Sequence, residues 1–383
     1  MIFQFTNSDL SKTFRYLHSI PETEWNEVKT SAYIKEKLLE FGMKPIECTK
    51  TGVYADIIGG KGEGKMILLR ADIDALPIKE ESGVEYASKN DGVMHACGHD
   101  FHTTCLLYAA KALFDNRDRL KGKVRVLFQP AEEGDGGAEP MINDGAMGEA
   151  DAAFAIHADP LECVGTISYR DGGITASPDD YKVVIKGRGG HGANPEKCIN
   201  PITVAAKIIS RYNKIKETYF PDTPCVTTVC TVNSGTLNNI IPDTAEITGT
   251  ARSFDEVTRE KLRKYLEYYA EKTAKEYGAE AEFTYNALFP PCVNDAKMNK
   301  TAINAAVKTE GITEIKELKD GLMIGDDFSY FARLVPSSYI RFGTAGKGEK
   351  YPLHSSKFKV DEKALIIGCR FFVNVAVEYL ENN

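Results

Sequence analysis

The sequence lacks any stretch of about 18 uninterrupted apolar residues and any block of about five like charges. The first absence argues against a membrane-spanning helix, because such a helix needs about 20 mostly apolar residues. The second argues against partners that are recognised by a basic segment, namely nucleic acids and anionic membranes. The formal net charge of −8, from 47 basic and 55 acidic side chains, supports the same exclusion.

The sequence also lacks paired cysteines. Its nine cysteines are an odd number and no two are spaced as C-x-x-C, which argues against a disulfide framework, a thioredoxin-like motif and a zinc ribbon. The segment MIFQFTNSDLSKTFRYLHSI has no basic region followed by an apolar one, so it does not resemble a signal peptide. We therefore expect a cytoplasmic protein with reduced thiols.

The chain is long enough for two domains, since it has 383 residues, 43% of them hydrophobic, and domains average roughly 150 residues. Residues 1–176 and 291–383 alternate strand-like and helical patterns, and their buried runs are typical of a parallel sheet covered on both faces. Residues 177–290 follow the order β-α-β-β-α-β of a ferredoxin-like α+β domain. The sequence thus predicts a discontinuous α/β domain with a second domain inserted into it. Within the first domain, the patterns predict helices near 24–42 and 297–309 and strands near 322 and 339–342.

The segment Met94–His102 packs three histidines, a cysteine and an aspartate into a short stretch. These side chain types bind divalent transition metals. Cys97 and His99 lie two residues apart, so both can point to one side of a turn, while Asp100 can orient a ligand from behind. A polar loop before a helix is the alternative interpretation, but the density of the cluster and the tight backbone that Gly98 allows favour a metal site.

Two adjacent glutamates, Glu132 and Glu133, follow the apolar strand-like run VRVLF. Open α/β sheets place their sites at the carboxyl ends of strands, where one glutamate can bind metal while its neighbour acts as a general base. Alone, such a pair is better explained as a solvated acidic turn, and His157 and His354 as structural histidines. However, of the seven histidines only His18 lies outside these motifs and the glycine-rich motif described next.

The glycine-rich segment 187–192 formally matches G-x-G-x-x-G. A dinucleotide-binding fingerprint opens a helix at once and carries an acidic residue about 20 positions later. Here Ala193-Asn194-Pro195 intervenes, and the first acidic residue in the right region is Glu217. We therefore reject a nicotinamide oxidoreductase and infer that the glycines let the backbone approach a ligand and present His191 to it.

Together these segments resemble the M20 metallopeptidases, and more narrowly the amidohydrolase branch that includes indole-acetyl amino acid hydrolases, hippurate hydrolases and N-acyl amino acid deacylases. The resemblance spans almost the whole chain in the family's order. It rests on the segments LLRADIDALPIKE, MHACGHDFHTT, VLFQPAEEG, MINDGAM, IHADP, KGRGGHGANPE, GTLNNIIPDTAEITGTARSF, DDFSYF and LHSSKF. The chain departs from the family's common pattern, in ways that bear on the acyl pocket, at Ala158-Asp159, Asn200, Asp326 and Ser356.

The resemblance implies two divalent metal ions per subunit, zinc or manganese and otherwise nickel or cobalt, in a catalytic α/β domain. It implies that the inserted domain is a lid and forms the interface of a homodimer. Matched by position, Glu132 is the general base, His191 is a catalytic residue that contacts the substrate with Asn239, and Arg252 is a weaker candidate for binding the substrate carboxylate. The implied metal ligands are Cys97, His99, Glu133, His157 and His354, and the implied supporting carboxylates are Asp72, Asp74 and Asp100.

The sequence therefore predicts a metal-dependent amidohydrolase that cleaves the amide of an N-acyl amino acid, such as an N-acetyl or N-benzoyl conjugate. The predicted products are a carboxylate and a free amino acid, formed by attack of a metal-bound hydroxide. A dipeptidase or aminopeptidase with the same dinuclear centre is the alternative enzyme. A non-catalytic metal- or ligand-binding protein on the same fold is the alternative from another class, and the intact Glu132 argues against it.

Overall fold

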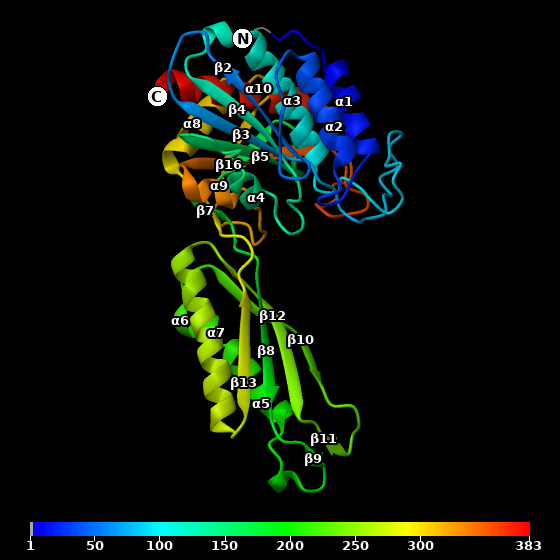
Figure 1. Ribbon diagram of the computed structural model, residues 1–383, viewed down its shortest axis with the longest axis vertical. Helices are drawn as coiled ribbons and strands as arrows, with labels where there is room; N and C mark the ends of the chain where they lie inside the picture. The colour runs from blue at the N-terminus through cyan, green and yellow to red at the C-terminus, as the bar shows by residue number, and fades with distance from the viewer. Residues whose placement is uncertain (1–2) are drawn as a thin grey trace. The chain divides into compact units, whose positions relative to one another are not determined.

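The computed structural model describes residues 3–383, and the chain divides into two compact units. The first unit comprises the chain up to Gly172 together with Val293–Lys319 and Asp326–Asn383, and the second comprises Gly173–Cys292 with Asp320–Gly325. The chain therefore leaves the first unit, builds the second and returns to the first (Figure 1). Among residues 3–383, none of the helices combines the length and apolar character needed to cross a bilayer.

The first unit is built on an eight-stranded sheet with the strand order β1-β2-β4-β3-β5-β16-β6-β15. The four neighbours β4, β3, β5 and β16 run parallel, as the buried apolar runs in β3 and β4 predict, whereas the pairs β1–β2, β2–β4 and β6–β16 are antiparallel. The bounds are Ile46–Cys48 (β1), Gly52–Ile58 (β2), Met66–Asp72 (β3), Lys123–Gln129 (β4), Ala152–Cys163 (β5), Thr166–Tyr169 (β6), Glu314–Glu317 (β15) and Ser337–Ala345 (β16).

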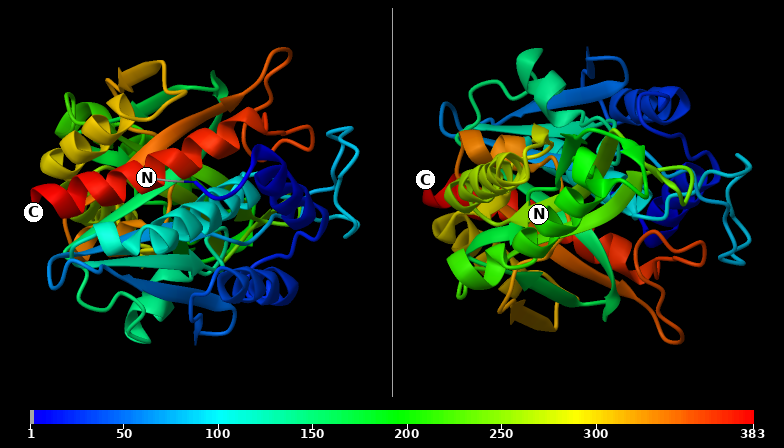
Figure 2. Two further views of the ribbon diagram at one scale, coloured as in Figure 1. Left: turned by 90° about the horizontal axis from the view of Figure 1, so that it is seen from above. Right: turned by 90° about the horizontal axis from the view of Figure 1, so that it is seen from below.

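Two long helices of the first unit, α3 (His99–Asp115) and α10 (Lys363–Asn382), pack side by side and contact β3 (Figure 2, left). Fourteen of the 17 residues of α3 are buried, because this helix is apolar on most of its circumference and fills the centre of the unit. The shorter helices of this unit are α1 (Asn7–Ser19), α2 (Val28–Glu40), α4 (Ala138–Asn143), α8 (Ala296–Val307) and α9 (Ser329–Leu334).

Two elements differ from the sequence prediction. Helix α2 begins four residues later than the predicted start at 24, because the Glu22 carboxylate accepts the N–H groups of Lys29 and Thr30 and so marks the helix start. The strand predicted near 322 is wrong. Leu322 forms only an isolated bridge to Thr175, since the glycines on both sides of this segment weaken a strand, and the strand lies earlier, as β15.

The second unit contains a four-stranded antiparallel sheet in the order β10-β12-β8-β13. Along β8, Tyr181, Val183 and Ile185 are buried, while Asp180 and Lys182 are exposed, so one face of the sheet packs against α5 and α7. The main elements follow the order β-α-β-β-α-β (Figure 1). Their bounds are Asp179–Lys186 (β8), Pro201–Tyr212 (α5), Cys225–Ser234 (β10), Thr244–Ser253 (β12), Glu256–Glu276 (α7) and Glu280–Asn286 (β13).

Shorter elements complete the second unit and its ends. Strands β9 and β11 form a separate two-stranded ladder, and β7 and β14 lie where the chain passes from one unit to the other. The bounds are Gly172–Thr175 (β7), Gly190–His191 (β9), Ile215–Tyr219 (α6), Ile240–Ile241 (β11) and Cys292–Asn294 (β14).

Candidate metal centre

The carboxyl ends of the parallel strands in the first unit meet at one edge of the sheet. Asp72 at the end of β3 pairs with Gln129 at the end of β4, and His157 of β5 pairs with Arg341 of β16. The glutamate pair after β4 therefore lies at the same edge as His157. Open α/β sheets bind their ligands at this edge.

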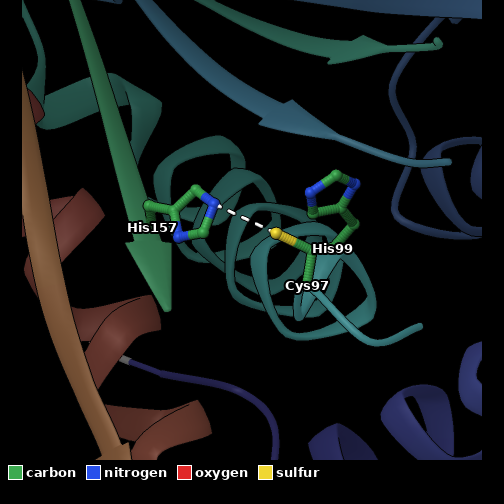
Figure 3. Close-up of side chains that lie close together, drawn as sticks. All are labelled: Cys97, His99 and His157. Atoms are coloured by element: carbon green, nitrogen blue, oxygen red, sulfur yellow. Dashed lines mark hydrogen bonds between the residues drawn. The ribbon is translucent and has the colours of Figure 1, made fainter. Parts of the chain in front are cut away.

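The cysteine–histidine segment reaches this edge through a glycine turn. Gly98 has φ +85°, and a Cβ atom there would lie 2.8 Å from Cβ of Ala158, so the turn between Cys97 and His99 requires glycine. Figure 3 shows Cys97, His99 and His157 gathered together, with Sγ of Cys97 3.4 Å from Nε2 of His157. One ligand atom from each lies within 4.8 Å of the other two.

A second group of possible ligand atoms shares Cys97. Glu133 and His354 join it within the same 4.8 Å, and Nε2 of His354 lies 3.2 Å from Oε1 of Glu133. His354 has φ +63° and its N–H donates to the carbonyl of Ala96, which ties its loop to the cysteine–histidine segment. The structure thus brings all five predicted ligands together.

The donor atoms of this cluster fit a divalent metal. Asp74 accepts a hydrogen bond from Nδ1 of His99 over 3.1 Å, which leaves Nε2 as the atom free to bind a metal. Among residues 3–383, Nε2 of His99 is a buried atom without a hydrogen-bond partner. A set of sulfur, imidazole and carboxylate donors suits zinc, and its imidazole and carboxylate groups also suit manganese.

The charges of the cluster also favour a cation. Burial lowers the pKa of His99, but Asp72 and Asp74 outweigh burial and raise it to about 10. Burial and the nearby Glu133 raise the pKa of the Cys97 thiol well above its usual range. A bound metal counters this second effect, because coordination deprotonates a thiol.

Glu132 lies beside the cluster in an acidic setting. Burial, and then Asp326 and Glu133, raise its pKa well above the usual value, so these surroundings favour the protonated carboxyl group. Its Oε2 lies 3.8 Å from Nε2 of His99. Glu132 is thus placed to act on a molecule held at the predicted ligands.

Sequence reasoning missed Arg70, which balances these carboxylates. Its guanidinium is completely buried and lies 2.6 Å from Asp72, 2.9 Å from Asp327 and 3.2 Å from Asp326. Buried charges persist when they are paired in this way. The sequence feature that could have identified Arg70 is a single arginine within the apolar strand sequence MILLRAD, since a buried arginine needs charged partners.

His102 supports the site, but both of its ring nitrogens form hydrogen bonds and neither is left to bind a metal. Its Nδ1 lies 2.5 Å from Oδ1 of Asp72, and its Nε2 accepts the N–H of Ala158 over 2.7 Å. Because Ala158 follows His157 directly, His102 positions this ligand. Asp72 therefore supports the site partly through His102.

Asp100 is placed differently from the predicted supporting role. Within the described chain, its carboxylate accepts hydrogen bonds from Nδ1 of His18, over 2.7 Å, and from the N–H of Phe101. Nε2 of the same His18 lies 3.0 Å from Oε1 of Glu80. His18, the one histidine outside the motifs, thus joins α1 to the start of α3 and to the loop that follows β3. Burial lowers the pKa of His18, but the hydrogen bonds to Asp100 and Glu80 outweigh it and raise the pKa to about 9.

We expect His18→Gln to destabilise the protein more at pH 6 than at pH 9.5. Because the folded-state pKa exceeds the unfolded value of 6.5, the protonated ring contributes its full stability below pH 6.5. That contribution is lost as the pH rises through 9. Urea unfolding is expected to show a loss of about 3 kcal/mol at pH 6 and a much smaller loss at pH 9.5. An equal loss at both pH values would contradict this explanation.

The turn that carries Glu132 and Glu133 is held by Glu27, which the sequence did not single out. Ala131 has φ +54°, a conformation that residues other than glycine rarely adopt. Its N–H donates to Oε1 of Glu27 over 2.9 Å, and Oε2 of Glu27 accepts from Oγ1 of Thr51 over 2.7 Å. Glu27 is completely buried. It therefore stabilises the strained backbone that directs the two glutamates.

We expect Glu27→Ala to weaken divalent metal binding by about 10-fold or more, as the loss of supporting partners commonly does. The matched control is Glu22→Ala in the same loop, which removes the carboxylate at the start of α2. The control is expected to lower the unfolding free energy by about 1 kcal/mol and to leave metal affinity unchanged. Competition titration against a metal chelator measures both affinities, and equal losses in the two variants would contradict the role of Glu27.

Three predicted residues belong to the second unit. His191 in β9 pairs with Ile240 in β11, and the N–H of Gly192 donates to the carbonyl of Asn239, so His191 and Asn239 lie together. Arg252 lies in β12 opposite Val226 of β10. Within residues 3–383 Arg252 forms no ion pair, and its Nη1 is buried without a hydrogen-bond partner.

Comparisons with known proteins cover nearly the whole chain. The family profile described as Peptidase family M20/M25/M40 matches residues 68–378. The N-acetyl-L-cysteine deacetylase of Bacillus subtilis is 40% identical over 96% of this chain and 88% of that protein. The thermostable carboxypeptidase 2 of Saccharolobus solfataricus is 38% identical over 95% of this chain and 94% of that protein.

A solved structure agrees closely with the present one. It is a Bacillus subtilis protein described as a dinuclear metal binding peptidase from the M20 family, with a TM-score of 0.88 and 36% identity. The match covers 98% of this chain and 99% of that chain.

Proposed function

Because the chain belongs to peptidase family M20/M25/M40, we propose that it hydrolyses the amide bond of N-acyl amino acids with two divalent metal ions. The observation that carries this proposal is the position of Glu132 beside five converging ligands. The similarity to a protein named as a deacetylase of an N-acetyl amino acid supports this substrate class. The similarity to a structure described as dinuclear supports two ions, and zinc or manganese is proposed from the donor set.

The proposed holders of the metals are Cys97, His99, Glu133, His157 and His354. Bound there, divalent ions supply Lewis acidity that activates water and polarises the amide carbonyl. Glu132 takes the proton from the attacking water and returns it to the departing nitrogen. Asp74 fixes the tautomer of His99, and Glu27 fixes the turn that aims Glu132.

The second unit is proposed to act as an inserted ferredoxin-like lid, residues 177–290, and as the interface of a homodimer. His191 and Asn239 would contact the substrate carbonyl and stabilise the charge that develops on its oxygen. A hydrogen-bond donor in such a place is commonly worth about 10²- to 10³-fold in rate. His191 precedes Gly192, whose N–H donates to the Asn239 carbonyl, so the two side chains come from adjacent segments.

A peptidase that cleaves unblocked dipeptides is the second candidate, and the similarity to a protein named as a carboxypeptidase supports peptidase activity in general. A panel of N-acetyl and N-benzoyl amino acids, assayed beside unblocked dipeptides with added zinc or manganese, separates the two. The proposal expects turnover of at least one N-acyl amino acid at higher kcat/KM than any dipeptide. Preference for dipeptides would assign the chain to the peptidase activity instead.

A further inference from the structure

Arg341 lies next to a proposed metal ligand, yet the proposed function gives it no role. It is the register partner of His157 on the neighbouring parallel strand, and its Nη1 lies 2.8 Å from Nδ1 of His157. Both side chains therefore lie on one face of the sheet, at the edge where open α/β sheets bind substrates.

The guanidinium of Arg341 is a buried cation with little to balance it. The residue is 5% exposed, and within residues 3–383 its one ion pair is a long one, 3.4 Å from Nη2 to Oδ2 of Asp159. Its Nε is buried without a hydrogen-bond partner. Arg70, equally buried at the same edge, instead pairs with three carboxylates and Gln129. Arg341 thus retains donors that a second partner can use.

The protonation of His157 decides whether its Nδ1 can accept a hydrogen bond from Arg341. Nδ1 of His157 lies 2.9 Å from the carbonyl oxygen of Ala158 as well as 2.8 Å from Nη1 of Arg341. It cannot donate to the first and accept from the second at once. When Nε2, which faces Sγ of Cys97, is the metal-binding atom, Nδ1 carries the proton and donates to Ala158. Nη1 of Arg341 then has no acceptor on His157.

We propose that Arg341 is a specificity residue that binds a carboxylate of the substrate, an inference that rests on the proposed amidohydrolase function. A planar guanidinium matches a carboxylate with two parallel hydrogen bonds, and the pair would neutralise the buried charge. An N-acyl amino acid offers such a group as its α-carboxylate, and a dicarboxylic acyl group offers a second one. The role that the resemblance implies for Arg252, in the second unit, is a separate one.

The test compares three substrates in the wild type and in Arg341→Met, which removes the guanidinium and keeps an unbranched side chain of similar length. They are the best N-acetyl amino acid of the panel, its α-amide, and the N-succinyl derivative of the same amino acid. If Arg341 binds the α-carboxylate, Arg341→Met raises KM roughly 10- to 100-fold for the N-acetyl and N-succinyl substrates, which both carry this group, and changes it little for the α-amide. If it binds the acyl carboxylate, the same rise is confined to the N-succinyl substrate. Equal kinetics of variant and wild type for all three would overturn the proposal.

Calorimetry of succinate and of the free amino acid binding to the metal-loaded protein gives a reading that needs no turnover. The proposal expects Arg341→Met to weaken the binding of succinate or of the free amino acid by roughly 10-fold or more. This measurement tests Arg341 even if none of the panel substrates is cleaved. Absence of cleavage would reject only the proposed amidohydrolase function. Arg341→Lys is expected to restore part of the binding. The control Arg370→Met removes an arginine paired with Glu310 and is expected to change neither reading.

Thermal unfolding separates binding from a purely structural role. If Arg341 serves only to hold Asp159, Arg341→Met lowers the melting temperature and leaves substrate preference and ligand affinity unchanged, which would refute the proposal. If it binds substrate, removal of a poorly paired buried charge leaves the melting temperature unchanged or higher.

Discussion

Glu132→Gln is expected to lower kcat by about 10²- to 10⁴-fold, the usual contribution of a positioned general base. Glutamine keeps the size of the side chain and its contacts with the surrounding acidic cluster but cannot carry a proton between water and the departing nitrogen. Metal content is expected to stay at the wild-type level, because Glu132 is not among the five proposed ligands. Removing one carboxylate from the group around Asp326 and Asp327 is not expected to unfold the protein.

Steady-state deacylation kinetics, with metal analysis of the same samples, check this expectation. The matched control is Glu139→Gln, a change of the same kind at an exposed position of α4, which is expected to retain wild-type kcat. If Glu132→Gln kept more than about a tenth of the wild-type kcat, the proton transfer assigned to Glu132 would be wrong.

His99→Ala is expected to weaken metal binding by more than about 100-fold, since even supporting partners of a ligand commonly contribute 10- to 100-fold. Loss of activity is expected to follow loss of metal. Nε2 of His99 faces the glutamate pair and has no hydrogen-bond partner within the described chain, so its deletion removes an atom that is otherwise unused.

His95→Ala is the matched control, because it removes the same atoms from the same segment. His95 is buried, burial lowers its pKa to about 4, and neither ring nitrogen has a hydrogen-bond partner in residues 3–383. Its replacement creates a cavity and is expected to cost about 2 kcal/mol of unfolding free energy while metal affinity stays unchanged. Equal metal affinities of the two variants would remove His99 from the centre.

The sequence named all five proposed ligands only through the resemblance to the M20 metallopeptidases, while its local patterns by themselves pointed to Cys97, His99 and Glu133. Cys97 and His99 stand in one dense motif, and Glu133 follows an apolar strand of the parallel sheet, whereas His157 lies within β5, opposite Arg341 of β16. Other long-range contacts of the first unit gave no such signal. His18 meets Asp100 across 82 positions, and Glu27 meets Ala131 across 104.

These long-range pairs are set by packing rather than by spacing. Nothing near Glu27 indicates that a residue other than glycine adopts φ +54° at position 131, and nothing in the histidine motif indicates that both nitrogens of His102 are already used. The strand predicted near 322 failed for a related reason, because an apolar run between glycines can form a bridge without forming a strand.

Metal titration of the metal-free protein, with deacylation of the best N-acyl amino acid followed in parallel, tests the central claim most directly. The account predicts no measurable turnover without metal and an activity that rises with bound zinc or manganese and levels off at two equivalents per chain. Full turnover in the metal-free protein, or two bound equivalents with no hydrolysis of any N-acyl amino acid, would contradict it.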